Sequence, residues 1–154
     1  MCLPITPYKV EREWKHAGLS CAVVQRREAG FRCGYVRVPP GHPLHGKDYD
    51  APDVDVHGGL SFAEIEPCNT HEDGVGWWFG WDCYHAFDMG SDPNVAIEDV
   101  VSPRSRRLIE DERDPRWATI HGEHFWTEPE VVAETERLAE QLAAVTISSA
   151  APPT

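Results

Sequence analysis

The chain has 154 residues, of which 26 are acidic and 14 are basic, and its formal net charge at pH 7 is −12. This length suits one compact domain, and the ordinary globular composition excludes disorder of the whole chain. The acidic balance argues against sequence-independent binding of duplex nucleic acid, and no apolar run approaches the ~18 residues that a membrane span needs. The first residues also lack the pattern of a signal peptide. We therefore expect a soluble, cytoplasmic protein that binds neither a membrane nor duplex nucleic acid.

The charge is distributed unevenly along the chain. Residues 1–47 hold eight basic and three acidic residues, a net charge of +5, whereas residues 48–154 hold six basic and 23 acidic residues, a net charge of −17. One interpretation is that the two parts attract each other within one fold. The other is that the basic segment receives an anionic ligand.

Five cysteines stand at positions 2, 21, 33, 68 and 83, with no CxxC pair. An odd number at irregular spacings, in a chain without a secretory signal, argues against a disulfide framework. We expect most of these cysteines to be reduced and buried, as small apolar side chains.

The first half of the chain predicts strands. Alternating or β-prone apolar residues predict strands at 8–14, 19–25, 31–38, 54–65 and 76–87. The first three are joined by short turns, which favours antiparallel neighbours in a meander. Between the third and fourth strands, residues 39–52 contain four Pro and two Gly, which indicates a long ordered loop or lid, and such loops often carry function.

The last element is predicted to be a helix at 128–145. Thr127 is a suitable N-cap, Glu130 completes a capping box, and Pro129 fits the first turn. A mostly apolar stripe should cover one face of the sheet, and it consists of Val131, Thr135, Leu138, Leu142 and Val145. The expected fold is α+β: an antiparallel sheet of about five strands with this amphipathic C-terminal helix on one face. Residues 1–147 should form a single globular domain, and residues 148–154 a flexible tail.

Histidines, glycines and tryptophans gather in the middle of the chain in a pattern that favours ligand binding. The loop offers hydrogen-bond donors to an anion, a Gly-Gly pair lets the backbone approach a ligand closely, and the tryptophans offer flat faces for stacking. The candidate ligand-binding residues are His42, His45, Lys47, His57, Gly58, Gly59, Trp78, Trp81, Asp82 and His85. The competing interpretation is that the tryptophans simply fill the core.

The same region contains residue types that suit zinc. His57, Cys83, His85 and Asp88 are candidate metal ligands, although no HExxH or paired CxxC spacing supports them. A metal-assisted hydrolase would use His57, His85 and Asp88. A cysteine nucleophile at Cys83 is a further alternative, with His57 or His85 as its base and Asp82 or Asp88 as the residue that orients the base. The competing interpretation is that both histidines are hydrogen-bonded structural residues and Cys83 belongs to the core.

Four segments in order carry a resemblance to a known group of proteins. They are Cys33-Gly34-Tyr35-Val36-Arg37, His42-Pro43-Leu44-His45-Gly46-Lys47-Asp48-Tyr49, His57-Gly58-Gly59-Leu60-Ser61, and Trp77-Trp78-Phe79-Gly80-Trp81-Asp82-Cys83-Tyr84-His85. They resemble a family of small uncharacterised proteins of bacteriophages, prophages and bacteria with the pattern CGYVR, HPxxGKxY, HGGLT and WWxGFDCAH. Ser61 and Trp81 replace the Thr and Phe of that pattern, and residues 94–116 look like an addition.

The resemblance implies a small α+β fold and a phage-type context in the cytoplasm of a bacterial host cell, and it implies no reaction. We expect a non-enzymatic accessory protein, without a cofactor, that binds a small anionic or nucleotide-like ligand or a host protein, in a role against host defence. The two alternatives are the metal-assisted hydrolase and an acidic interaction protein that mimics nucleic acid.

Overall fold

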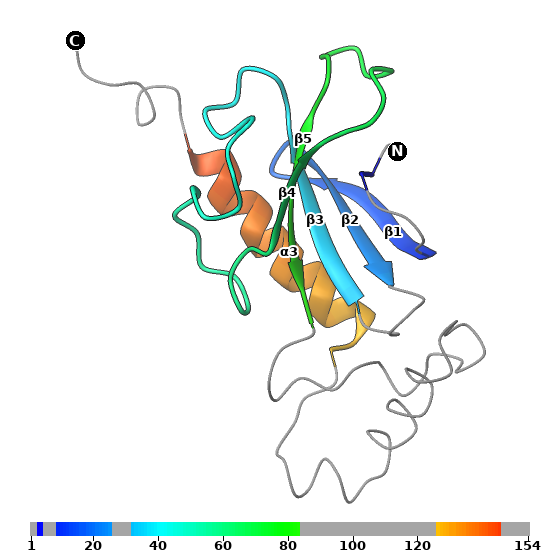
Figure 1. The fold of residues 1–154 in the computed structure, drawn as a ribbon. Helices are drawn as coiled ribbons and strands as arrows, with labels where there is room; N and C mark the ends of the chain where they lie inside the picture. The colour runs from blue at the N-terminus through cyan, green and yellow to red at the C-terminus, as the bar shows by residue number, and fades with distance from the viewer. Residues whose placement is uncertain (1–2, 5–8, 26–31, 84–125, 146–154) are drawn as a thin grey trace, which may run out of the picture.

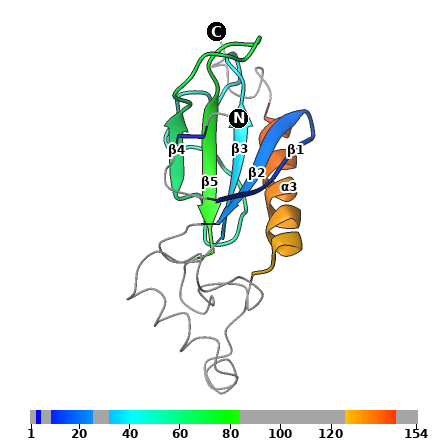
Figure 2. The ribbon, with the colours of Figure 1, turned by 90° about the vertical axis from the view of Figure 1, so that its right-hand side faces the viewer.

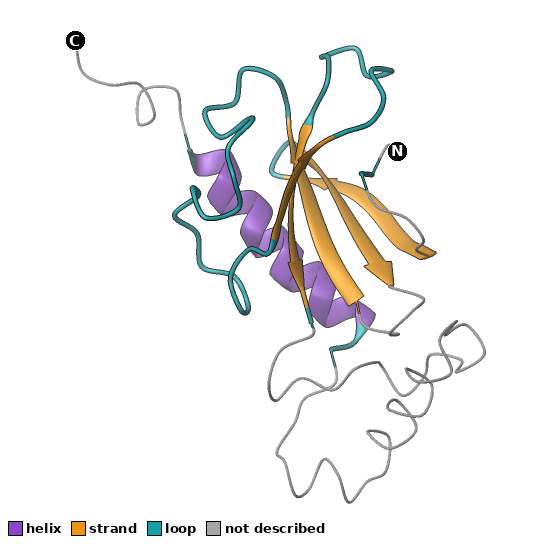
Figure 3. Ribbon diagram, viewed as in Figure 1, coloured by secondary structure: helices purple, strands orange, loops and turns teal. Residues whose placement is uncertain are grey.

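The computed structural model describes residues 3–4, 9–25, 32–83 and 126–145. Within these ranges the chain forms an antiparallel five-stranded sheet with one helix packed on it, which confirms the expected α+β class (Figures 1 and 3). Several sequence-based predictions concern residues outside the described ranges: His85 and Asp88, the added segment 94–116 and the tail 148–154. None of the described helices is long and apolar enough to cross a membrane.

The sheet has the strand order β1-β2-β3-β5-β4, and every neighbouring pair is antiparallel. The strands are β1 (Lys9–His16), β2 (Leu19–Gln25), β3 (Arg32–Val38), β4 (Phe62–Ile65) and β5 (Trp77–Asp82). The first three form the predicted meander. The chain then leaves the sheet through the long loop, adds β4 at the far edge, and returns to fill the place between β3 and β4 with β5 (Figure 1).

The fourth strand is much shorter than predicted. We expected a strand over 54–65, but only Phe62–Ile65 pairs with β5. Gly58 and Gly59 adopt positive φ angles of 67° and 80°, which a strand does not accommodate. The residues before them lie against the helix, where Asp55 N–H donates to the Gln141 side chain at 2.7 Å.

Helix α3 (Glu128–Ala144) begins as the sequence predicts. Thr127 is the N-cap, its side chain accepts from Glu130 N–H, and the Glu130 side chain accepts from Thr127 N–H, so the capping box is complete. Most of the predicted apolar stripe is buried, together with one alanine: Val131, Thr135, Leu138, Ala139 and Leu142. The helix packs across β1, β2 and β3 on a single side of the sheet (Figure 2).

Each face of the sheet has its own apolar cluster. The helix-side cluster contains Cys21, Val23, Val36, Phe79 and Trp81 with the helix residues. The opposite face, here called the open face, holds a second cluster, which consists of Leu3, Ala22, Val24, Cys33, Tyr35 and Trp78, with Phe62 packed against it. The alternation of side chains along β3 and β5 places neighbouring residues in different clusters.

Charged groups join the first strand to the helix. Arg12 lies 3.5 Å from Glu128, and the two ring nitrogens of His16 lie 2.8 Å from Glu136 and 2.7 Å from Glu140. These contacts support the interpretation in which the basic first part of the chain and the acidic remainder attract each other within one fold.

Candidate ligand-binding site

His42 is engaged in holding the loop to the helix. Its Nε2 lies 2.8 Å from the carbonyl of Leu142, and its Nδ1 accepts from the Leu44 N–H at 3.0 Å. Because Nδ1 is an acceptor, the ring is the tautomer that carries its proton on Nε2 and donates it to Leu142. Both nitrogens of this predicted ligand-binding residue therefore serve the fold.

The other two loop residues predicted to bind a ligand, His45 and Lys47, differ in their contacts. The Nε2 of His45 donates to the carbonyl of Val75 at 2.8 Å, and the ring lies beside Trp77 with centroids 6.0 Å apart. Lys47 is exposed. The loop histidines are thus directed at the protein's own backbone, one at the helix end and one at the segment before β5.

The segment of His57, Gly58 and Gly59 lies on the helix side of the sheet. The backbone N–H of His57 donates to Glu134 of α3 at 3.0 Å, and its ring lies 4.5 Å from the Trp126 ring and 6.0 Å from the Trp81 ring. The His57 ring therefore lies near the side of β5 from which Trp81 points. This group of aromatic rings belongs to the packing between loop, sheet and helix.

The two tryptophans predicted to offer stacking faces to a ligand lie on opposite faces of the sheet. Trp81 is on the helix side, where its indole N–H donates to the Thr135 hydroxyl at 3.1 Å. Trp78 is on the open face, fully buried, and its indole N–H donates to Glu66 at 3.2 Å. Side chains an odd number of positions apart in a strand point to opposite faces, and Trp78 and Trp81 are three positions apart, so they cannot form one stacking surface. They fill the two apolar clusters, as the competing interpretation held.

The metal prediction concerns residues that are only partly described. Among the residues that the structure describes, no three His, Cys, Asp or Glu side chains are grouped so that they could hold a metal ion. Cys83 is buried and in no disulfide, and His85 and Asp88 lie outside the described ranges. The zinc site therefore stays a prediction.

The expectation that most cysteines are reduced and buried is confirmed for three of the four described cysteines. Cys21, Cys33 and Cys83 are buried thiols outside any disulfide. Burial raises the pKa of the Cys21 thiol to about 12. Cys68 is disulfide-bonded, contrary to the expectation from odd number and spacing. The spacing of cysteines in a sequence does not show which of them lie close together in the fold. This disulfide could therefore not be predicted from the sequence.

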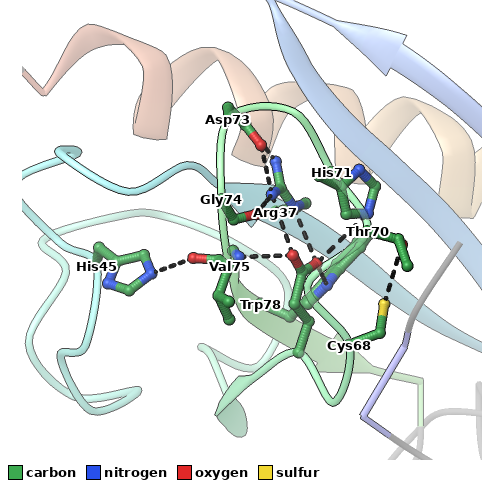
Figure 4. A network of polar contacts seen from close by, with 11 residues as sticks. Arg37, His45, Cys68, Thr70, His71, Asp73, Gly74, Val75 and Trp78 are labelled. Atoms are coloured by element: carbon green, nitrogen blue, oxygen red, sulfur yellow. Dashed lines mark hydrogen bonds and ion pairs between the residues drawn. The ribbon is translucent and has the colours of Figure 1, made fainter.

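An ion-pair network holds the segment between β4 and β5, with Arg37 and Glu66 buried and Asp73 partly exposed. The guanidinium of Arg37 binds Glu66 through Nε at 2.9 Å and Nη2 at 3.1 Å, and binds Asp73 through Nη1 at 3.0 Å and Nη2 at 2.9 Å (Figure 4). Gly76 N–H and the Trp78 indole also donate to Glu66, whose side chain is completely buried.

Sequence reasoning missed this network. The detectable signal is an arginine inside the apolar run that follows Arg32 in β3, because a buried guanidinium requires acidic partners. Nothing in the spacing indicates that those partners are Glu66 and Asp73, 29 and 36 residues further along.

One end of the open face has a pocket of about 210 Å³. Its lining residues come from β3, β5 and the start of β4, and they are Cys33, Tyr35, Ser61, Phe62, Gly80, Trp81 and Asp82. The rings of Tyr35 and Phe62 meet edge to face with centroids 5.4 Å apart. The Ser61 hydroxyl donates to Asp82 Oδ2 at 2.7 Å. We call this the open-face pocket.

Gly80 makes room for the aromatic part of the open-face pocket. A Cβ atom at this position would lie 2.6 Å from Cε1 of Tyr35 and 3.2 Å from Cβ of Phe62. The bare backbone of Gly80 thus lets the Tyr35 ring lie across β5. Of the residues that sequence analysis proposed for ligand binding, Asp82 and Trp81 line this pocket, whereas Tyr35, Phe62 and Ser61 were missed because their convergence depends on strand order.

A second hollow of about 380 Å³ lies at the other end of the open face. It is lined by Lys15, Ser20, Arg37, His71, Glu72 and Asp73. Arg37 is committed to two carboxylates, and the hollow contains acidic as well as basic groups. It therefore lacks the excess of positive charge that would select an anion.

Comparison of the chain with protein-family models, with curated proteins and with solved structures gave no match.

Proposed function

We propose that this protein is a non-enzymatic binding protein for a small ligand, and that the ligand occupies the open-face pocket. The observation that carries the proposal is the convergence of two aromatic rings, Tyr35 and Phe62, with a hydrogen-bonded pair, Ser61 and Asp82, around one concavity. Apolar walls with a few placed polar groups are the usual form of a small-molecule site.

The pocket modifies the kind of ligand that the sequence suggested. A small anion would meet the carboxylate of Asp82, whereas the aromatic rings suit a flat ring. Between the anionic and the nucleotide-like ligand, the pocket therefore supports the nucleotide-like one. Its volume is below the 300 Å³ or so of common ligand sites, so it accommodates a single ring rather than a whole nucleotide.

The cellular setting in this proposal comes from the sequence alone. We propose a phage-type accessory protein of the bacterial cytoplasm, on the basis of the four segments from Cys33 to His85. A host protein as partner, the metal-assisted hydrolase and the acidic mimic of nucleic acid stay predictions, because no described contact favours any of them.

Nuclear magnetic resonance tests the proposal directly. Full-length protein labelled with ¹⁵N is titrated with a panel of nucleosides and of small aromatic fragments. Binding in the pocket is expected to shift the backbone amides of Ser61, Phe62, Gly80 and Asp82, while the amides of Lys47 and His42 stay unchanged. The variant Phe62→Leu keeps an apolar side chain but removes the aromatic ring, and it should weaken binding of the ligand. If no compound shifts these four amides, the proposed function is wrong.

A further inference from the structure

The second hollow of the open face, of about 380 Å³, is lined entirely by polar and charged side chains. We call it the polar hollow, and its lining consists of Lys15, Ser20, Arg37, His71, Glu72 and Asp73. Its volume lies within the range of roughly 300–1,000 Å³ that is usual for small-molecule sites. Because no apolar side chain lines it, a ligand would be recognised here by charge and hydrogen bonds.

One part of the lining comes from the hairpin of β1 and β2. Lys15 and Ser20 stand opposite each other in the register of the two strands. Both point to the open face, because Trp14 and His16, the neighbours of Lys15, contact α3 on the other side of the sheet. Among the described residues, neither the Lys15 ammonium nor the Ser20 hydroxyl has a hydrogen-bond or ion-pair partner. This side of the hollow therefore offers an ammonium and a hydroxyl that suit a carboxylate.

The other part of the lining comes from the segment between β4 and β5. Arg37 holds this segment by binding Asp73 through both carboxylate oxygens, at 2.9 and 3.0 Å, and Figure 4 shows Asp73 and His71 beside the guanidinium. The hydrogen bonds from Arg37 keep the pKa of Asp73 below its usual 3.8, so this carboxylate is ionised. Glu72, the next residue, is exposed and has no hydrogen-bond or ion-pair partner in the described part of the chain. This side therefore offers a carboxylate that suits an ammonium.

The charges of the lining are balanced but not paired. Its ionisable side chains are Lys15, Arg37, His71, Glu72 and Asp73, and with the histidine neutral two positive charges stand against two negative ones. The charge of Arg37 is already shared by two carboxylates. Lys15 and Glu72 are left as opposite charges that line one hollow and form no ion pair with each other. A molecule with an ammonium and a carboxylate would give each of them a partner.

We propose that the polar hollow binds a free α-amino acid, whose carboxylate is bound by Lys15 and Ser20 and whose ammonium is bound by Glu72. A simple anion would be repelled by Glu72 and Asp73, and a simple cation would be repelled by Lys15, whereas a zwitterion is attracted at both ends. The polar hollow shares no lining residue with the open-face pocket, so this site is separate from that of the proposed function.

The test compares serine with two molecules that each lack one of its charged groups. Serine has a small polar side chain, which suits a lining without apolar residues; ethanolamine lacks its carboxylate, and 3-hydroxypropionate lacks its ammonium. Each is titrated at about pH 7.5, where an ordinary histidine is mostly neutral, into ¹⁵N-labelled full-length protein. The amides of Ser20, His71 and Asp73 locate binding, and that of Gly80 should stay unchanged. We expect serine to bind at least about tenfold more tightly than either truncated molecule, because each truncation leaves one charged side chain without its partner.

Two variants assign the two ends of the ligand. Lys15→Met removes the ammonium and should abolish the preference for serine over ethanolamine. Glu72→Gln removes the carboxylate charge at equal size and should abolish the preference for serine over 3-hydroxypropionate. Lys47→Met and Glu64→Gln make the same changes at exposed residues outside the hollow, and they should leave the affinity for serine within about twofold of the parent's. Thermal unfolding shows whether all four variants fold as the parent does.

Each result decides the proposal. If 3-hydroxypropionate binds as tightly as serine, the hollow takes a simple anion, and if ethanolamine does, it takes a simple cation; either result overturns the proposal. Serine that shifts none of the three amides at tens of millimolar overturns it as well, and so does a Lys15→Met protein that keeps the parent's ranking of the three molecules. None of these results bears on the open-face pocket, which the nucleoside and fragment panel tests by itself.

Discussion

His42 donates a hydrogen bond from Nε2 to the carbonyl of Leu142, with 2.8 Å between the two atoms, and thereby joins a loop to a helix 100 residues further along the chain. Leu142 belongs to the last turn of α3, and its carbonyl also accepts from the C-cap N–H of Val145 at 3.2 Å. His42 gives this carbonyl a second donor and fixes the loop that follows β3.

We expect His42→Ala to lower the free energy of unfolding by about 1–3 kcal/mol, because the Leu44 N–H loses its acceptor and the Leu142 carbonyl loses one of its two donors, in a part-buried place. Denaturant unfolding followed by circular dichroism measures the change. Lys47→Ala, an exposed change in the same loop, should stay within about 0.5 kcal/mol of the parent. Equal stability of His42→Ala and Lys47→Ala would show that His42 has no role in holding the fold.

The ion pair between Arg37 and Glu66 gives a second prediction. Glu66→Gln keeps the size of the side chain but leaves the 6%-exposed guanidinium with Asp73 as its only carboxylate. Breaking a buried pair costs about 3–5 kcal/mol, and the remaining Asp73 should reduce this to about 2–3 kcal/mol. Denaturant unfolding measures the loss, and Glu64→Gln on the exposed side of the same region is the matched control. A loss below that of Glu64→Gln would contradict the structural role of the network.

The dependence of stability on pH in the acidic range tests the same ion pair between Arg37 and Glu66. Burial acts to raise the pKa of Glu66, but the hydrogen bonds from Arg37, Gly76 and Trp78 outweigh it, so this pKa lies below its usual value of 4.5. A carboxyl with a lowered folded-state pKa contributes stability above its unfolded pKa and loses it as the pH falls through the folded pKa. The parent should therefore lose stability below about pH 4.5 more steeply than Glu66→Gln, as thermal melts across this range would show.

Sequence reasoning predicted the elements better than the site. Strand β2 and the capping box at Thr127 follow from local patterns, and both were found where expected. The position of β5 between β3 and β4 depends on a crossover that no local pattern encodes. That crossover brings Tyr35 and Phe62 together. Trp78 and Trp81 face opposite ways for a local reason, because they stand three positions apart in β5 and side chains alternate along a strand.

The roles of the loop histidines could likewise not be predicted from the sequence. A histidine directed at a backbone carbonyl and one directed at a ligand have the same sequence signature, since both stand in Gly- and Pro-rich loops. His45 and His42 could be distinguished only once Val75 and Leu142 were known to lie beside them.

His16 makes the contact between β1 and α3 dependent on pH. Its hydrogen bond with Glu140 is the main cause that raises its pKa above 6.5, with partial desolvation opposing and the charges of Glu136 and Glu140 adding to it. A group with a raised folded-state pKa gives stability that is complete below the unfolded pKa and is lost as the pH rises through the folded pKa. We therefore expect the melting temperature to fall as the pH rises above about 6.5.

Two variants separate this histidine from the other titrating groups. His16→Gln should remove the fall in melting temperature over that range, and Glu140→Gln should bring the His16 pKa back toward 6.5, as proton resonance of the ring would measure. A His16→Gln protein whose melting temperature still falls as the parent's does would show that another group causes the dependence.

Gly34 lies where Thr135 of the helix comes close to the backbone of β3. A Cβ at this position would be 2.1 Å from Oγ1 of Thr135 and 2.3 Å from Nε1 of Trp81, two atoms that are hydrogen-bonded to each other at 3.1 Å. A methyl group therefore cannot enter without separating α3 from β3 or breaking that hydrogen bond. We expect Gly34→Ala to cost about 3 kcal/mol or more of the free energy of unfolding, from overpacking and the loss of a buried hydrogen bond.

Gly59→Ala is the informative control, because nothing lies within 4 Å of its added Cβ but its φ of 80° disfavours any side chain. It should cost about 1–2 kcal/mol by backbone strain alone. Thr135→Val, which removes only the hydroxyl, should cost an intermediate amount, since the Trp81 N–H then remains buried without its acceptor. If Gly34→Ala unfolds no more easily than Gly59→Ala, the helix is not held to the sheet at this point, and the close approach of α3 to β3 is wrong.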